Sequence, residues 1–264
     1  MFLKSDILFS PHAFSTRIGG VSQLESTEEN NLAFGRGDPD ETVIKNLEIF
    51  GKDVGFDPEN VISLPQIHST VIHKVDRSHA GLGYYIREYK DICEGDGYVT
   101  NDRGIVLGVK GADCTPILFE ARNKNEILAV GAVHSGWRGT AGAIGRKCVE
   151  LLCEYYHVLP GNVFACIGPC IHRCCFEVGG DVYDEMISRL GDKYACFFKE
   201  KNQHAGKYYC DLPQINRQIL IDVGLPDCNI DIMENCTCCN PQFFYSHRRS
   251  GNNRGTMLNV IFMP

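Results

Sequence analysis

The chain has 264 residues, 44% of them hydrophobic and 22% charged, which is the composition of a globular protein with a substantial core. Its formal net charge of -7 at pH 7 argues against general binding to nucleic acid, because an acidic surface repels the phosphate backbone. No apolar run approaches the length of a membrane span, and residues 1–11 lack the pattern of a secretory signal. We therefore expect a cytoplasmic protein without a membrane partner, whose fourteen cysteines are reduced thiols.

Hydrophobic periodicity predicts a mixture of helices and strands along the chain. In chain order, these are a helix at Asp40–Phe50, strands at Val61–Ile67, Thr70–Val75, Ile105–Val109, Thr115–Phe119 and Ile127–Val133, helices at Gly139–Tyr156, Gly180–Leu190 and Asp211–Val223, and strands at Gln242–His247 and Met257–Phe262. Asp211 and Gln214 have the spacing of a capping box at the start of the last helix. Hairpin-like joins outnumber regular βαβ units, which favours an α+β class with mixed sheets flanked by helices. No repeat or linker divides the chain, so we expect one domain over residues 1–264.

Three of the predicted strand boundaries carry a side chain of the type that binds zinc. His68 lies between the strands of the first pair, Cys114 lies between those of the second, and His134 ends the buried strand that follows. Two histidines and one cysteine leave one tetrahedral position open, which is the pattern of a catalytic zinc site. Two other interpretations remain open: ordinary buried or hydrogen-bonded side chains, and a Cys–His nucleophile pair of Cys114 with His134 or His68.

A second group of residues is suited to binding an anion. The segment Ser135–Gly142 joins a predicted strand to a predicted helix, and it combines glycines with Arg138. Glycines let the backbone approach a ligand, and a helix N-terminus beside a cation suits a phosphate or a carboxylate. Arg17 and Arg248 lie in two further polar segments that could contact a substrate. The alternative for each segment is a solvated polar surface.

Cysteines also gather in two other regions of the sequence, at Cys166, Cys170, Cys174 and Cys175 and at Cys236, Cys238 and Cys239. Only Cys236 and Cys239 have the C-x-x-C spacing, and no second such pair occurs at zinc-ribbon spacing. We expect free thiols in both regions, with a structural metal or a redox role as the alternative.

Six motifs, taken together and in order, carry a family resemblance. They are Phe14–Ser22 (FSTRIGGVS), Gln66–His68 (QIH), Ala112–Pro116 (ADCTP), Val133–Thr140 (VHSGWRGT), Ile167–Ile171 (IGPCI) and Phe244–Arg249 (FYSHRR). The chain resembles the YfiH/YlmD family over nearly its whole length. That family is also called the peptidoglycan editing factor or multicopper polyphenol oxidoreductase family, and it includes FAMIN-type purine nucleoside phosphorylases.

The resemblance implies a layered αββα domain, similar to the catalytic domain of cytotoxic necrotizing factor. It also implies zinc on His68, Cys114 and His134, with copper as the alternative metal. In the family's usual tail Gly-Arg follows the Arg-Arg pair, whereas this chain has Asn253-Arg254-Gly255, so Arg254 is the candidate equivalent.

The function implied by the resemblance is phosphorolysis of adenosine, inosine and methylthioadenosine, together with deamination of adenosine. Nucleoside and phosphate are then the expected partners. We assign Cys114 to the metal, Asp113 to acid–base catalysis because it is adjacent, and Trp137 to stacking on the purine. The phosphate is assigned to arginines, because bidentate cations suit its oxygens; these are Arg17, Arg138 and Arg248.

Three alternatives to the nucleoside enzyme remain. The first is a hydrolase that removes an amino acid from a peptidoglycan precursor, using the same metal or Cys114 as nucleophile. The second is copper oxidation of phenols, for which one His-Cys-His set offers too few ligands for a multicopper cluster. The third is a non-enzymatic binding partner, for which replacing His68 or Cys114 would change no turnover.

Overall fold

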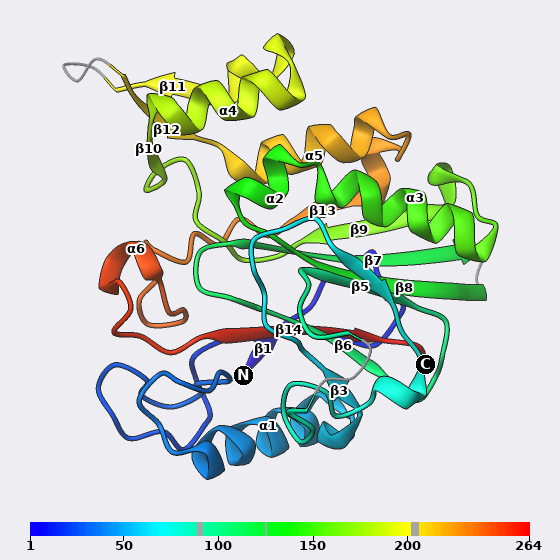
Figure 1. The fold of residues 1–264 in the computed structure, drawn as a ribbon, viewed down its shortest axis with the longest axis vertical. Helices are drawn as coiled ribbons and strands as arrows, with labels where there is room; N and C mark the ends of the chain where they lie inside the picture. The colour runs from blue at the N-terminus through cyan, green and yellow to red at the C-terminus, as the bar shows by residue number, and fades with distance from the viewer. Residues whose placement is uncertain (89–91, 125, 202–205) are drawn as a thin grey trace.

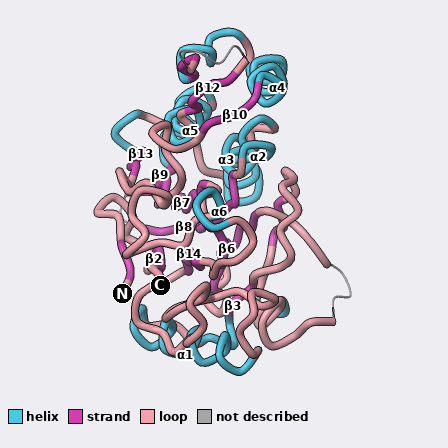
Figure 2. The backbone as a smooth tube through the Cα atoms, turned by 90° about the vertical axis from the view of Figure 1, so that its left-hand side faces the viewer, coloured by secondary structure: helices cyan, strands magenta, loops and turns pink. Residues whose placement is uncertain are grey.

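The centre of the molecule is a pair of β-sheets stacked face to face, with helices on both outer faces (Figure 1). The computed structural model describes residues 1–88, 92–124, 126–201 and 206–264. Helix α1 (Asp40–Val54) covers one sheet, whereas α3 (Ile144–Tyr156) and α5 (Leu212–Asp222) cover the other (Figures 1 and 2). This arrangement confirms the predicted α+β class with mixed sheets flanked by helices.

The sheets are mixed, because antiparallel neighbours predominate but three strand pairs run parallel. The five-stranded sheet has the order β1 (Phe2–Leu3), β2 (His12–Ser15), β14 (Met257–Phe262), β6 (Val106–Gly111) and β3 (Val61–Ile62). The six-stranded sheet has the order β13 (Ile230–Ile232), β9 (Val163–Ile167), β7 (Thr115–Asn123), β8 (Glu126–Ser135), β5 (Gly97–Thr100) and β4 (Ile72–Lys74). The parallel pairs are β3–β6, β4–β5 and β9–β13.

A smaller unit follows β9. It consists of β10 (Glu177–Gly179), helix α4 (Gly180–Leu190), β11 (Phe198–Glu200) and β12 (Lys207–Cys210). Two short helices, α2 (Trp137–Ala141) and α6 (His247–Ser250), lie near the functional site described below. Short 3-10 helices complete the chain at Pro58–Asn60, Arg77–His79, Pro160–Asn162, Asp192–Phe197 and Asp227–Asn229.

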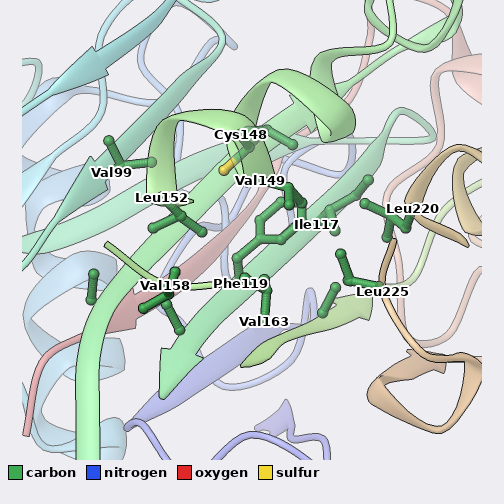
Figure 3. Packing of buried hydrophobic residues seen from close by; sticks show 14 of the residues in the cluster. Val99, Ile117, Phe119, Cys148, Val149, Leu152, Val158, Val163, Leu220 and Leu225 are labelled. Carbon is green, nitrogen blue, oxygen red and sulfur yellow. The ribbon is translucent and has the colours of Figure 1, made fainter. Parts of the chain in front are cut away.

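Strand β7 shows why the layers form. Successive side chains of a strand point to opposite faces. Ile117 and Phe119 pack in the cluster beneath α3 and α5, whereas Leu118 packs in the cluster between the two sheets. Figure 3 shows the first of these clusters, in which Val149 and Leu152 of α3 meet Ile117 and Phe119. Burial on both faces explains why this strand reads as a continuous apolar run rather than an alternating one.

Most of the predicted elements exist, but several boundaries were wrong. The predicted helix at Gly139–Tyr156 is two helices, because Ala143 has a left-handed φ of 53° and interrupts it. The predicted strand at Val61–Ile67 ends at Ile62. Asp211 makes no side-chain capping bond, so the capping box was wrong; its carboxylate instead lies 3.6 Å from Arg173.

The predicted strand at Gln242–His247 was also wrong. Phe244 and Tyr245 are buried in an irregular segment, and Ser246 then caps α6 by accepting a hydrogen bond from the backbone of Arg249. Their aromatic character reflects burial rather than strand formation. Over the described ranges, no helix combines the length and apolar character needed to cross a membrane.

Candidate metal centre

Three side chains from distant parts of the sequence converge at one point. The ligand atoms of His68, Cys114 and His134 all lie within 4.8 Å of one another. The sulfur of Cys114 lies 3.8 Å from Nε2 of His68, and the centroids of the two imidazole rings are 4.9 Å apart. His68 lies in the loop between β3 and β4, Cys114 in the turn between β6 and β7, and His134 near the end of β8. Such a three-ligand set fits a zinc ion with one open position.

Asp96 orients both histidines. Its Oδ1 lies 2.8 Å from Nδ1 of His134 and accepts a hydrogen bond of 3.1 Å from the backbone N–H of His68. Its Oδ2 accepts a bond of 2.6 Å from the N–H of Ser69. A proton held on Nδ1 of His134 leaves Nε2 free to bind a metal, which is the usual role of a carboxylate behind a ligand histidine. His68 is held at a φ of +58°, a conformation that non-glycine residues rarely adopt.

The electrostatics favour a cysteine thiolate. Burial alone would raise the pKa of Cys114, but the charges and hydrogen bonds of His134 and His68 outweigh burial and lower the pKa to about 6. Burial likewise opposes protonation of His134, yet Cys114 and Asp96 raise its pKa to about 9. Because the thiolate is the form that binds metal, this environment suits a ligand cysteine. It would equally suit a Cys–His nucleophile pair.

Gly136 closes one side of the three ligands. A Cβ atom added there would lie 3.0 Å from Cδ2 of His68 and 3.2 Å from the sulfur of Cys114. The backbone therefore approaches the ligands so closely that a Cβ would fit only if they shifted slightly. The glycines of this segment predicted an anion site, whereas the contact of Gly136 with the metal ligands could not be predicted from the sequence.

The three ligands lie in a cavity of about 980 Å³, the size of a site for a small-molecule ligand. Other side chains predicted for the site also line it: Asp113, Trp137, Arg138 and Arg248. Aromatic rings of Phe34 and Phe176 add apolar surface to the lining.

Cations that the sequence analysis did not assign to the substrate form part of the same lining. Burial, and then the charge of Arg36, lower the pKa of Lys110 to about 8. The same two causes lower the pKa of Arg254 to about 10, against the opposing effect of Asp113 and Cys114. Nε of Arg254 is buried without a hydrogen-bond partner among the described residues. Arg36 thus repels both Lys110 and Arg254, and three cations beside one cavity favour the binding of an anion.

Asp113 lies in the cavity wall, but its carboxylate is already engaged. Oδ1 accepts a hydrogen bond from Thr237, and Oδ2 accepts bonds from the hydroxyl of Ser246 and the backbone N–H of Arg248. Both carboxylate oxygens are therefore occupied by donors from the protein itself. The geometry therefore supports a structural role for Asp113 more than the acid–base role predicted from its position beside Cys114.

The three predicted arginines differ in position. Arg17 does not line the cavity: its guanidinium lies 4.9 Å from the ring of Tyr245 and donates to the carbonyl of Pro241. Arg138 is exposed and lies 4.2 Å from the ring of Trp137. Arg248 of α6 donates to the backbone carbonyls of Cys175 and Glu177, so it ties α6 to the segment that leads into β10.

Comparisons with known proteins agree with this architecture. Residues 11–264 match the family model described as multi-copper polyphenol oxidoreductase laccase. A protein of Geobacillus stearothermophilus named purine nucleoside phosphorylase YlmD is 33% identical, with 94% of this chain and 88% of the relative covered. Adenosine deaminase RL5, from an unknown prokaryotic organism, is also 33% identical, with 95% of this chain and 93% of the relative covered.

Solved structures show the same fold. Bacillus licheniformis YfiH superposes with a TM-score of 0.88 at 28% identity, covering 96% of this chain and 92% of the other. YlmD of Geobacillus stearothermophilus superposes with a TM-score of 0.86 at 32% identity, covering 96% and 91%. Since the family model spans nearly the whole chain and the fold is shared, the protein belongs to the multi-copper polyphenol oxidoreductase laccase family, together with YfiH and YlmD.

Proposed function

We propose that this protein is a zinc-dependent purine nucleoside phosphorylase that also deaminates adenosine. The observation that carries the proposal is one cavity that places the His68, Cys114 and His134 ligands beside the cations Lys110 and Arg254. Phosphorolysis needs such a pairing, because an anionic nucleophile must be held next to a nucleoside whose base is leaving. The names of the relatives, purine nucleoside phosphorylase and adenosine deaminase, support the same substrate class.

Zinc is the metal that best fits the donor set. Two imidazole nitrogens and a thiolate suit this borderline-soft ion, and the three donor atoms lie close enough to share it. When bound, zinc supplies a Lewis acid that polarises a substrate atom or acidifies a water molecule. Copper is the alternative, because the same ligand types bind it as well.

The protein's own side chains hold and orient the two substrates. Lys110, Arg36 and Arg254 bind phosphate oxygens, so that one oxygen attacks C1′ of the ribose. The bond from C1′ to the purine nitrogen breaks, and the bonding electrons leave with the base. The products are ribose 1-phosphate and the free purine. We assign the purine to the face of Trp137, which lines the cavity and is half-buried.

The cations that we propose for the phosphate thus differ from the arginines expected from the sequence. Arg138 and Arg248 line the cavity and remain second contacts, whereas Arg17 lies outside it. Arg254 remains the candidate equivalent of the family's tail arginine, and its position near Asp113 and Cys114 supports a role at this site.

Deamination is a second reaction for the same site. It replaces the C6 amino group of adenosine with oxygen from water and releases ammonia. The relative named adenosine deaminase supports this activity at a similar level of identity. It requires the metal ligands but not the phosphate-binding cations, so the two reactions make different demands on Lys110 and Arg254.

Product analysis with and without phosphate tests the proposal. Inosine should give hypoxanthine and ribose 1-phosphate only when phosphate is present, and adenosine should give adenine together with inosine. Lys110→Met should raise the KM for phosphate and leave deamination nearly unchanged, whereas the exposed Lys52→Met serves as its matched control.

Base release that is independent of phosphate would contradict phosphorolysis. Turnover of a muramyl peptide without turnover of nucleosides would instead support the peptidoglycan-editing hydrolase. Oxygen consumption with phenols would support a copper oxidase. The last two results would each replace the proposal with a named alternative.

A further inference from the structure

A second group of potential metal ligands lies outside the site just described. The sulfur atoms of Cys174, Cys175, Cys236 and Cys239 all lie within 4.8 Å of one another. We call this group the four-thiol cluster. It combines parts of the two cysteine-rich regions of the sequence, for which free thiols were expected and a structural metal was the alternative.

The sheet topology explains why these regions meet. Cys174 and Cys175 lie in the loop after β9, and Cys236 and Cys239 lie in the segment after β13. Strands β9 and β13 are parallel neighbours, so both loops begin at the same end of the sheet, where the carboxyl ends of the strands lie. An isolated bridge between Cys170 and Cys236 extends the pairing beyond the strands.

The sulfur separations match a metal site better than they match a disulfide. The sulfur of Cys239 lies 3.5 Å from that of Cys174 and 3.2 Å from that of Cys175. A disulfide bond is about 2.05 Å long. Around zinc with Zn–S bonds of about 2.3 Å, tetrahedral geometry places the four sulfurs about 3.8 Å apart.

Backbone hydrogen bonds hold one of the sulfurs in place. Cys236 is buried, and the backbone of His172 and that of Cys239 hydrogen-bond its sulfur. The C-x-x-C turn therefore fixes the first sulfur relative to the backbone of the last residue. A bound dication would offset the repulsion between four thiolates gathered at one point.

The cluster also lies behind the wall of the substrate cavity. Thr237, within the C-x-x-C turn, donates to Asp113, which is adjacent to Cys114. Arg249 donates to the carbonyls of Thr237 and Cys238, and Arg248 donates to that of Cys175. Joining the two loops through their sulfurs would therefore fix the segment that carries Arg248 and the backbone around Asp113.

We propose that Cys174, Cys175, Cys236 and Cys239 bind a structural zinc ion, the second metal ion of this chain. Four protein ligands leave no open position, which is the pattern of a structural rather than a catalytic site. The ion would clamp the loops after β9 and β13 together.

Zinc counting on purified, reduced full-length protein tests this proposal separately from the proposed function. Wild type should hold two zinc ions per chain. Cys114→Ala should hold one, and X-ray absorption at its zinc edge should show four sulfur neighbours at about 2.3 Å. Cys236→Ser should hold one, bound by mixed nitrogen and sulfur ligands. Cys228→Ser, at an exposed free thiol, is the matched control and should hold two.

The absorption measurement leaves the four-thiol cluster unmutated, so it remains decisive if Cys236→Ser fails to fold. Loss of all zinc from Cys114→Ala would overturn the proposal, as would a disulfide within the cluster in reduced, zinc-supplied protein. Failure of the proposed catalytic site gives a different result: wild type would hold one zinc ion with four sulfur neighbours, and Cys114→Ala would keep it.

Discussion

Oδ1 of Asp96 lies 2.8 Å from Nδ1 of His134, and both side chains are buried. The same oxygen accepts the backbone N–H of His68, so one carboxylate orients two of the three candidate metal ligands. The backbone N–H of His134 in turn donates to the carbonyl of Asp96 at 2.7 Å. Because these contacts fix the backbone of His68 and the position and tautomer of the His134 ring before a metal arrives, Asp96 should control metal affinity.

Replacement of Asp96 by Asn tests this role. Asn cannot provide the negative charge behind His134, and its amide can donate where a carboxylate only accepts. We expect Asp96→Asn to lower zinc affinity at this site by about 10- to 100-fold, measured by competition with a chelator. Asp53→Asn, at an exposed position of α1, should leave the affinity unchanged. Equal affinities in both variants would exclude the proposed role of Asp96.

The pKa of Lys110 gives the phosphate site a pH dependence. Lys110 is charged below its lowered pKa of about 8 and loses its charge above it, whereas phosphate stays a dianion there. We therefore expect kcat/KM for phosphate to fall as the pH rises through 8. Lys110→Arg keeps its charge throughout this range and should remove that decline. The corresponding pH profiles for adenosine deamination serve as the internal control. An identical decline in Lys110→Arg would assign the titration to another group.

A side chain at Gly136 should disturb the metal ligands. A Cβ at this position would lie 3.0 Å from His68 and 3.2 Å from Cys114, so these side chains would have to shift slightly. We expect Gly136→Ala to lower kcat/KM, but by less than the loss of about 100-fold that follows a misplacement of about 1 Å, because the ligands need to shift by only a few tenths of an ångström. Gly161→Ala is the matched control, because a Cβ there meets no atom within 4 Å. Similar activities in the two variants would show that Gly136 does not position the ligands.

A buried ion pair outside the cavity should contribute to the stability of the fold rather than to activity. Glu120 lies 3.0 Å from a guanidinium nitrogen of Arg122, which is flanked by the rings of Phe9 and Phe164. Glu120→Ala would leave the cation without its partner, so we expect unfolding free energy to fall by about 3–5 kcal/mol. Chemical denaturation measures this change. Glu150→Ala, on the exposed face of α3, should change stability by no more than about 0.5 kcal/mol. A comparably small change in Glu120→Ala would contradict the importance of the pair.

The sequence predicted the parts of the site that depend on residue type and local pattern. His68, Cys114 and His134 have the chemistry of zinc ligands and lie in the recognised motifs, and the structure brings them together. The sequence did not point to Asp96. An acidic residue between two glycines, Gly95 and Gly97, is typical of an ordinary turn. Its importance arises only when the loop that carries His68 folds against it.

The sequence also did not predict the cations that we propose for the phosphate, for a related reason. Arg36, Lys110 and Arg254 are separated by long stretches of sequence, and none of them is in a phosphate-binding motif. Their proximity comes from packing of the β6 end against two loops, which periodicity does not encode. Likewise, the aromatic pair Phe244 and Tyr245 was read as a strand because burial and strand propensity favour the same residue types.

The most direct test of the central claim is to measure zinc content and phosphate-dependent release of hypoxanthine from inosine on the same samples of wild type and Cys114→Ala. The exposed Cys196→Ser is the matched control. We predict that Cys114→Ala loses one zinc ion per chain together with base release, while Cys196→Ser keeps both. Base release from a Cys114→Ala sample, or from metal-stripped wild type, would contradict a zinc nucleoside enzyme built on His68, Cys114 and His134.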